Sequence, residues 1–207
     1  MNGLPFDAVL CDFDGVVHLW DPDGMSALDR AWGLTEGTLA GAAFNGPLLH
    51  AAITGRLSDE QWRRKVAEAL TPDCGSPARA LDLVGSWSAL TGRIDTDVVH
   101  LLAALRSRVP VVLVSNATTR LESSLASMGL TDAFDAVINT ARIGVAKPDP
   151  RVFAIAARQA GADMTRCLLV DDTLPNVEAA RAAGLSGLHY QCFEQLRDEV
   201  APLLDHD

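Results

Sequence analysis

The sequence predicts an α/β protein: a Rossmann-like open parallel sheet with helices on both faces, plus a small α-helical cap inserted after the first strand. Short runs rich in Val, Leu and Ile alternate with stretches of helical spacing. That alternation is typical of an open sheet whose crossovers are right-handed. Between residues 16 and 92 no convincing strand occurs, and a connection of that length needs structure of its own, which indicates the cap.

Five apolar runs are predicted to form the sheet. Each is short and free of charged residues, as expected for parallel strands that are covered on both faces. The last run is the weakest. In chain order they are Ala8 to Cys11, Val111 to Val114, Ala136 to Ile138, Cys167 to Val170 and Gly187 to Tyr190.

Helices are predicted where apolar residues recur at helical spacing, and several of these stretches end at a glycine. In the core they are Thr119 to Met128, Pro150 to Ala160 and Pro175 to Ala183. In the cap they lie around Met25 to Trp32, Ser58 to Leu70 and Ala78 to Trp87. The polar tail from Arg197 to Asp207 is predicted to fray.

The predicted core comprises residues 1–15 and 93–207, and the predicted cap residues 16–92. All four tryptophans, Trp20, Trp32, Trp62 and Trp87, fall in the cap. A small helical bundle needs bulky side chains to fill its own interior, so we expect most of them to be structural. One or two are candidates for lining a substrate pocket.

Composition and charge exclude several classes of partner. The formal net charge of -10 disfavours binding to nucleic acid or to an anionic membrane, and an anionic substrate would need strong local positive charge. The sequence has no long uncharged apolar run and no basic-then-apolar N-terminal segment, so we expect a cytoplasmic protein. The sequence does not define an oligomeric state.

The four cysteines, Cys11, Cys74, Cys167 and Cys192, show no CxxC spacing. Cys11 and Cys167 lie inside predicted strands. We therefore expect buried free thiols rather than a disulfide or a zinc site.

Polar residues follow three of the predicted strands where each strand ends. In open α/β sheets, ligands bind at this carboxyl edge, so these side chains are expected to converge. They are Asp12 and Asp14, Ser115 and Asn116, and Asp171 and Asp172.

The acidic residues among them indicate a metal. Up to four carboxyl groups in one small volume raise one another's pKa values unless a cation intervenes. Mg²⁺ suits such a site because it takes oxygen ligands from carboxylates, water and substrate phosphate. Asp14 would lie beside Asp12 in an extended backbone, or swing off that line if the chain turns at Gly15.

Lysine usage singles out Lys147. The chain has two lysines against fifteen arginines, and Lys147 lies between a predicted strand and a helix, directly before Pro148. A compact ammonium can sit between a carboxylate and a phosphoryl oxygen as a point charge, which the planar guanidinium cannot match. We therefore expect Lys147 in the site.

Taken in order, these residues resemble the haloacid dehalogenase superfamily, most of whose members are phosphatases. Its four motifs are similar to Asp12-Phe13-Asp14-Gly15 after a strand, Ser115 at a strand end, Lys147-Pro148, and the Asp171-Asp172 pair with Asn176 beyond it. The resemblance spans roughly residues 8–191. The insert looks like the small helical cap of the subgroup that carries its cap after the first motif.

The resemblance implies a role for each motif residue. Asp12 would be the nucleophile that forms an aspartyl-phosphate, and Asp14 the general acid and base. Mg²⁺ would be held by Asp12, the backbone carbonyl of Asp14 and Asp172, with Asp171 helping through water. Ser115, Asn116 and Lys147 would bind the phosphoryl oxygens. A small phosphorylated metabolite is the expected substrate, since a cap leaves little room for a macromolecule.

The sequence departs from the family pattern just after the first motif. Many capped members carry an acidic residue there, whereas this chain has Val17-His18-Leu19-Trp20 before Asp21. His18 and Trp20 fall where the cap would hinge, and both are candidate substrate contacts. For His18, the alternative is a hinge residue hydrogen-bonded to backbone.

Three other functions can be weighed against the phosphatase. A phosphotransferase or mutase would use the same nucleophile but needs an acid-base group of its own in the cap, for which His18 or Lys65 could serve weakly. A dehalogenase is disfavoured because that branch lacks an aspartate at the position of Asp14. A catalytically idle binding protein would be marked by a lost nucleophile or metal aspartate, and none is lost.

Overall fold

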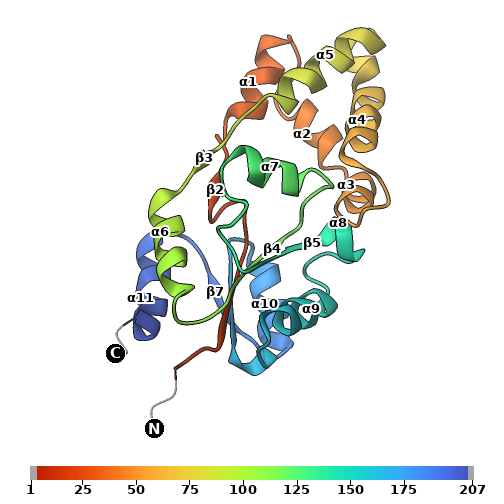
Figure 1. Ribbon diagram of the computed structural model, residues 1–207. Helices are drawn as coiled ribbons and strands as arrows, with labels where there is room; N and C mark the ends of the chain where they lie inside the picture. The colour runs from red at the N-terminus through yellow and green to blue at the C-terminus, as the bar shows by residue number, and fades with distance from the viewer. Residues whose placement is uncertain (1–3, 205–207) are drawn as a thin grey trace.

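The computed structural model describes residues 4–204 (Figure 1). Its core is a sheet of five parallel strands in the order β5-β4-β1-β6-β7. This confirms the predicted fold class. Leu10 of the central strand lies opposite Val112 on one side and Leu169 on the other. The strands are β1 (Ala8–Cys11), β4 (Val111–Ser115), β5 (Ala136–Asn139), β6 (Cys167–Asp171) and β7 (Ser186–His189).

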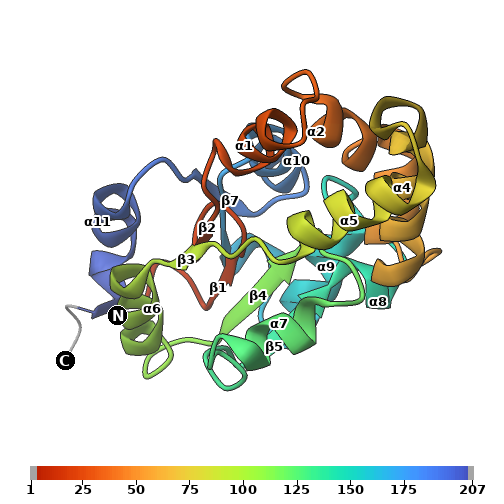
Figure 2. The same ribbon diagram turned by 90° about the horizontal axis from the view of Figure 1, so that it is seen from above.

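Helices cover both faces of the sheet, because alternate strand residues point to opposite sides. Val9 and Cys11 pack with α6 (Thr96–Leu105), α7 (Leu121–Ser127) and α11 (Phe193–Leu204). Ala8 and Leu10 pack with α9 (Pro150–Ala160) and α10 (Leu174–Ala182). Figure 2 shows α6 and α11 side by side, on the opposite side of the sheet from α9. Two short elements, α8 (Thr140–Ile143) and the 3₁₀ helix Met164–Arg166, complete the core.

The predicted fraying of the tail is wrong as far as residue 204. Helix α11 continues to Leu204, and Leu196, Val200 and Leu203 are completely buried against the first face of the sheet. Their spacing of four and three residues forms one apolar stripe in an otherwise polar segment, and burial of that stripe stabilises the helix. Residues 205–207 lie outside the described part of the chain.

The insert contains five helices: α1 (Gly24–Ala31), α2 (Thr38–Ala43), α3 (Gly46–Ile53), α4 (Asp59–Cys74) and α5 (Pro77–Ser88). Only three were predicted, because α2 and α3 are too short to show a clear period. The prediction of no strand in this stretch is also wrong. Strand β2 (His18–Leu19) pairs antiparallel with β3 (Arg93–Ile94), and the two form a ribbon at the ends of the insert.

The insert has a hydrophobic core of its own. Trp62 is buried in it, its ring lies edge-on to that of Trp87, and Trp32 packs against the cluster. These three tryptophans therefore fill the interior of the bundle, as expected. Trp20 is different, because half of its surface is exposed, and it lines a cavity described below.

A second contact joins the insert to the core, away from the ribbon. The Thr118 hydroxyl donates to Asp59 Oδ1 at 2.8 Å, and the Asp59 backbone N–H donates to Thr119 Oγ1 at 2.9 Å. Nearby, Gly55 packs so closely on α8 that a Cβ built there would lie 2.0 Å from the Ala141 carbonyl oxygen. The start of α4 is thus docked on the loop after β4.

The cysteines form no disulfide within the described chain. Cys11, Cys74 and Cys167 are buried free thiols, as predicted. Cys192 is also free but exposed, which corrects the expectation of burial for that residue. Within residues 4–204, none of the helices combines the length and apolar character that crossing a bilayer requires.

Candidate active site

The carboxyl ends of β1, β4 and β6 meet at one edge of the sheet and border a cavity of about 660 Å³. Of the residues predicted for the site, all but Asp171 and His18 line it. Asp171 and His18 are buried and do not reach the cavity surface. The predicted residues at the cavity surface are Asp12, Asp14, Trp20, Ser115, Asn116, Lys147 and Asp172.

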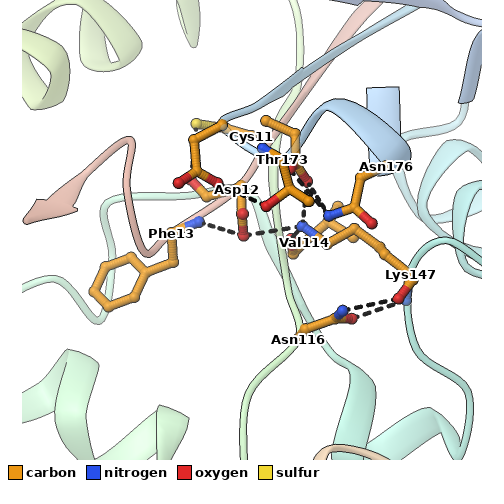
Figure 3. A network of polar contacts seen from close by, with 10 residues as sticks. Cys11, Asp12, Phe13, Val114, Asn116, Lys147, Thr173 and Asn176 are labelled. Carbon is orange, nitrogen blue, oxygen red and sulfur yellow. Dashed lines mark hydrogen bonds and ion pairs between the residues drawn. The ribbon is translucent and has the colours of Figure 1, made fainter. Parts of the chain in front are cut away.

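Lys147 is fully buried, with its ammonium between two carboxylates (Figure 3). Nζ lies 2.9 Å from Asp12 Oδ1 and 2.6 Å from Asp171 Oδ2, and it donates to the Val114 carbonyl at 2.8 Å. These three contacts match the three N–H donors of an ammonium. Lys147 is therefore not an ordinary surface lysine. In this arrangement it holds carboxylates, and its contact with a phosphoryl oxygen stays a prediction.

Asp171 is completely buried and fully paired. Besides the Lys147 ammonium, it accepts bonds from Asn176 Nδ2, at 3.0 and 3.2 Å, and from the Thr173 backbone N–H at 2.9 Å. A buried carboxylate with so many donors is fixed in place. Thr173 was not singled out from the sequence. It contributes its backbone N–H at the start of α10, and a backbone group leaves no signal in the side-chain pattern.

Asn116 holds the loop that carries Lys147. Its side-chain Nδ2 donates to the Lys147 carbonyl at 2.9 Å, and its Oδ1 accepts from the Lys147 backbone N–H at 2.8 Å. This pair of bonds joins the end of β4 to the lysine loop, which also contains the cis peptide between Lys147 and Pro148. Because the amide is occupied in this way, phosphate binding by the Asn116 side chain stays a prediction. Ser115 is almost completely buried at the cavity floor.

Asp12 accepts a 2.8 Å bond from the Phe13 backbone N–H through Oδ1, the oxygen that Lys147 also contacts. Its other oxygen has no hydrogen bond from the described residues. Burial raises the pKa of Asp12 to about 7, although the Lys147 ammonium opposes the shift. Burial, together with the nearby Asp171 charge, also raises the pKa of Asp172.

The described chain contains one group of carboxylates close enough to share a metal ion: Asp12, Asp171 and Asp172, with oxygens within 4.8 Å of one another. Hard oxygen donors of this kind fit Mg²⁺. Gly15 leaves room for the group, since a Cβ there would lie 2.0 Å from Asp172 Oδ2. Gly15 has a φ of +86°, and the chain turns there.

That turn takes the Asp14 side chain away from the other three carboxylates. Asp14 Oδ1 lies 2.8 Å from His18 Nδ1 and accepts a 2.8 Å bond from Trp20 Nε1. The His18 side chain is only 1% exposed, so its burial argues against the candidate substrate contact. The ring of His18 bonds to the Asp14 carboxylate, whereas the alternative prediction for His18 was a hydrogen bond to the backbone. Trp20 remains at the cavity surface.

Fold and site together are those of an α/β hydrolase with an acidic centre at the carboxyl edge of its parallel sheet. More specifically, the chain belongs to the haloacid dehalogenase-like hydrolase family, whose model matches residues 6–184.

Two relatives in sequence illustrate this membership. Haloacid dehalogenase-like hydrolase domain-containing protein 3 of Mus musculus is 30% identical over 186 residues, which cover 84% of this chain and 69% of that protein. Phosphatase MT3486 of Mycobacterium tuberculosis is 36% identical over 93 residues, 45% of this chain and 43% of that protein.

Solved structures share the fold. A HAD family enzyme of Bacteroides thetaiotaomicron superposes with a TM-score of 0.76 at 19% identity, covering 94% of this chain and 98% of that one. The same enzyme has been solved in complex with magnesium and inorganic phosphate. L-2-haloacid dehalogenase of Xanthobacter autotrophicus superposes with a TM-score of 0.65 at 26% identity, covering 95% and 83%.

Proposed function

We propose that the protein is a Mg²⁺-dependent phosphatase that hydrolyses a small phosphorylated metabolite through an aspartyl-phosphate on Asp12. The observation that carries the proposal is the cavity itself. Asp12 lies there beside a buried ammonium, with one oxygen held by hydrogen bonds and the other without a partner among the described residues. A second carboxyl group, Asp14, is held separately and lines the same cavity. Relatives named as phosphatases, including MT3486, support it.

Asp12 would attack phosphorus with Oδ2, because Oδ1 is engaged by the Phe13 N–H and the Lys147 ammonium. As the new O–P bond forms, the bond from phosphorus to the alcohol oxygen breaks, and Asp14 gives its proton to that oxygen. Water then attacks the aspartyl-phosphate, Asp14 takes a proton from it, and the Asp12 carboxylate is released.

The charged groups of the site favour this chemistry. Lys147 holds Asp12 in a fixed orientation and offsets its negative charge, so the nucleophile need not be reoriented during the reaction. Asp12 and Asp172, with the backbone carbonyl of Asp14, would hold Mg²⁺, and Asp171 would act through water because its oxygens already accept several bonds. When bound, the ion would offset charge on the phosphoryl oxygens.

The size of the cavity supports a small substrate. A volume of about 660 Å³ falls within the roughly 300–1,000 Å³ typical of small-molecule sites. No residue of helices α1 to α5 lines it, and the contribution from the region of the insert is Leu19 and Trp20 of the ribbon segment. Trp20 is the aromatic surface that a leaving group would meet.

The alternatives have less support. A mutase needs an acid-base group from the cap, but Lys65 is exposed and does not line the cavity, and His18 is buried with Nδ1 engaged by Asp14. A dehalogenase has no leaving oxygen to protonate, whereas Asp14 faces this cavity. An idle binding protein would not need the nucleophile, the ammonium and the acidic group together.

The test is hydrolysis of p-nitrophenyl phosphate by purified protein with Mg²⁺, beside an Asp12→Asn variant and an EDTA-treated sample. We expect activity in the wild-type protein and loss of it in both controls. Turnover that survives Asp12→Asn would refute the covalent mechanism, and turnover that survives EDTA would refute the metal requirement. A 2-haloacid tested in parallel should release no halide.

A further inference from the structure

We propose that His18 and Trp20 are positioning residues for Asp14, which fix its carboxyl group through a shared acceptor oxygen. The inference deepens the proposed phosphatase function and rests on it. It assigns a specific task to the two residues by which this chain departs from the usual sequence after the first motif.

The geometry is a clamp on one oxygen. His18 Nδ1 lies 2.8 Å from Asp14 Oδ1, and Trp20 Nε1 lies 2.8 Å from the same atom. Because an indole N–H can only donate, the Trp20 bond has a fixed direction. His18 donates to the same oxygen in the tautomer that carries its proton on Nδ1. The Asp14 side chain is otherwise half-exposed at the cavity, so these contacts fix its orientation.

The clamp assigns different tasks to the two oxygens of Asp14. Oδ1 accepts both ring N–H groups, so the proton that is passed to the leaving alcohol resides on Oδ2. A free aspartate rotates about its side-chain torsions, and holding one oxygen restricts that rotation. The two donors thus keep the acidic proton directed at the bond that breaks.

The rings themselves are held by their surroundings. His18 stacks on Phe13 at 5.2 Å between ring centroids and meets the edge of Trp20 at 4.5 Å. Gly92 closes the far side, since a Cβ there would lie 2.4 Å from His18 Nε2. Within the described chain Nε2 has no hydrogen-bond partner, so the ring makes its single polar contact with Asp14. A buried histidine that is held on both sides and bonds only to one carboxylate is suited to positioning.

The experiment compares two phosphate esters that differ in their need for a proton. An alkyl phosphate expels an alkoxide and needs general-acid help, whereas 2,4-dinitrophenyl phosphate expels a stable phenolate. The parameter is kcat/KM with Mg²⁺, because it reports steps up to the formation of aspartyl-phosphate. General-acid catalysis contributes about 100- to 10,000-fold, and positioning accounts for part of it.

We expect His18→Leu and Trp20→Phe to lower kcat/KM for the alkyl ester by about tenfold to a hundredfold, through kcat, and for the dinitrophenyl ester by less than about threefold. His18→Asn places an amide N–H near the position of Nδ1 and should recover most of the loss. Trp32→Phe, a tryptophan of the cap interior, is the matched control and should change neither ester by more than about twofold.

A second readout does not depend on turnover. Each of the four tryptophans contributes one indole N–H signal to a proton–nitrogen NMR spectrum, and the signal that Trp20→Phe removes is that of Trp20. Asp14→Ala should shift that signal and leave the signal of Trp32 in place.

The outcomes separate the two proposals. Equal losses for both esters, a loss confined to KM, or a Trp20 signal that Asp14→Ala leaves unmoved would overturn the positioning role while the phosphatase function stands. A wild-type protein that is folded, binds Mg²⁺ and hydrolyses neither ester would overturn the phosphatase function, and the positioning role with it.

Discussion

The ammonium nitrogen of Lys147 lies 2.6 Å from Asp171 Oδ2, and both side chains are completely buried. A pair of this kind is costly to break, because removing one partner leaves the other charge in a medium that solvates it poorly. The same ammonium contacts Asp12, so it links the fold to the proposed nucleophile.

Lys147→Met should therefore destabilise the metal-free protein by roughly 3–5 kcal/mol, measured by urea unfolding. The matched control is Arg151→Met, which removes the exposed pair between Arg151 and Asp149 and should cost less than about 1 kcal/mol. A loss for Lys147→Met no larger than that of the control would show that the buried pair contributes little.

The raised pKa of Asp12 predicts an unusual dependence of stability on pH. Because its pKa in the folded protein is about 7, above the ordinary value of 3.8, the protonated form stabilises the fold. This contribution is complete below about pH 3.8 and is lost as the pH rises through 7. Carboxyl groups with lowered pKa values, such as Asp135, have already ionised by pH 5, so they do not change the unfolding free energy above that pH.

We therefore expect the unfolding free energy of the metal-free protein to fall between pH 5 and pH 8, measured by urea titrations in EDTA. Asp12→Asn should flatten that slope. Mg²⁺ should restore stability mainly at the upper end, because binding requires the ionised carboxylates. Its affinity should drop by up to about tenfold per pH unit below 7. Calorimetry in buffers of different ionisation heat would reveal the released proton, and a pH-independent affinity would refute the idea.

The sheet and the convergence of its polar residues could be predicted from the sequence for a simple reason. Buried parallel strands are apolar throughout, and their carboxyl ends necessarily share an edge, so Asp12, Ser115 and Asp171 had to meet there. The apolar pattern along each strand and the polar residues at its end were sufficient to locate this edge of the sheet. The sequence context of Lys147 also placed it in the site near a carboxylate, but neither its burial nor its contact with two carboxylates was predicted.

Other features depend on contacts between residues far apart in the chain, or on backbone groups. The carbonyl of Val114 and the N–H of Thr173 are site groups with no side-chain signal. The bond of Asn116 to the Lys147 loop spans 31 residues and depends on the loop conformation. The turn of Asp14 toward His18 and Trp20 follows from the conformation at Gly15, which the sequence left open.

Gly15 itself offers a sharp test of the metal site. A Cβ at this position would overlap Asp172 Oδ2, so Gly15→Ala should displace that carboxylate and weaken Mg²⁺ binding at least about tenfold, measured by calorimetry. Gly33→Ala is the control, because its φ of +73° is similar and no atom lies within 4 Å of the added carbon. Equal affinities in the two variants would show that Mg²⁺ binding does not depend on the close approach of Asp172 to Gly15.

Gly55→Ala tests the docking of the cap on the core. The added Cβ would lie 2.0 Å from the Ala141 carbonyl oxygen, and a backbone atom of this kind cannot move away without a large cost in energy. Gly55 also has a φ of +71°, which is unfavourable for alanine. Gly129 has nearly the same φ, +72°, with no atom within 4 Å of a Cβ, so Gly129→Ala isolates the backbone strain, about 1–2 kcal/mol. We expect Gly55→Ala to exceed that loss and to increase hydrogen exchange at the start of α4, where Asp59 meets Thr118 and Thr119. If both variants lose the same stability and α4 stays protected, the contact at Gly55 does not hold the cap in place.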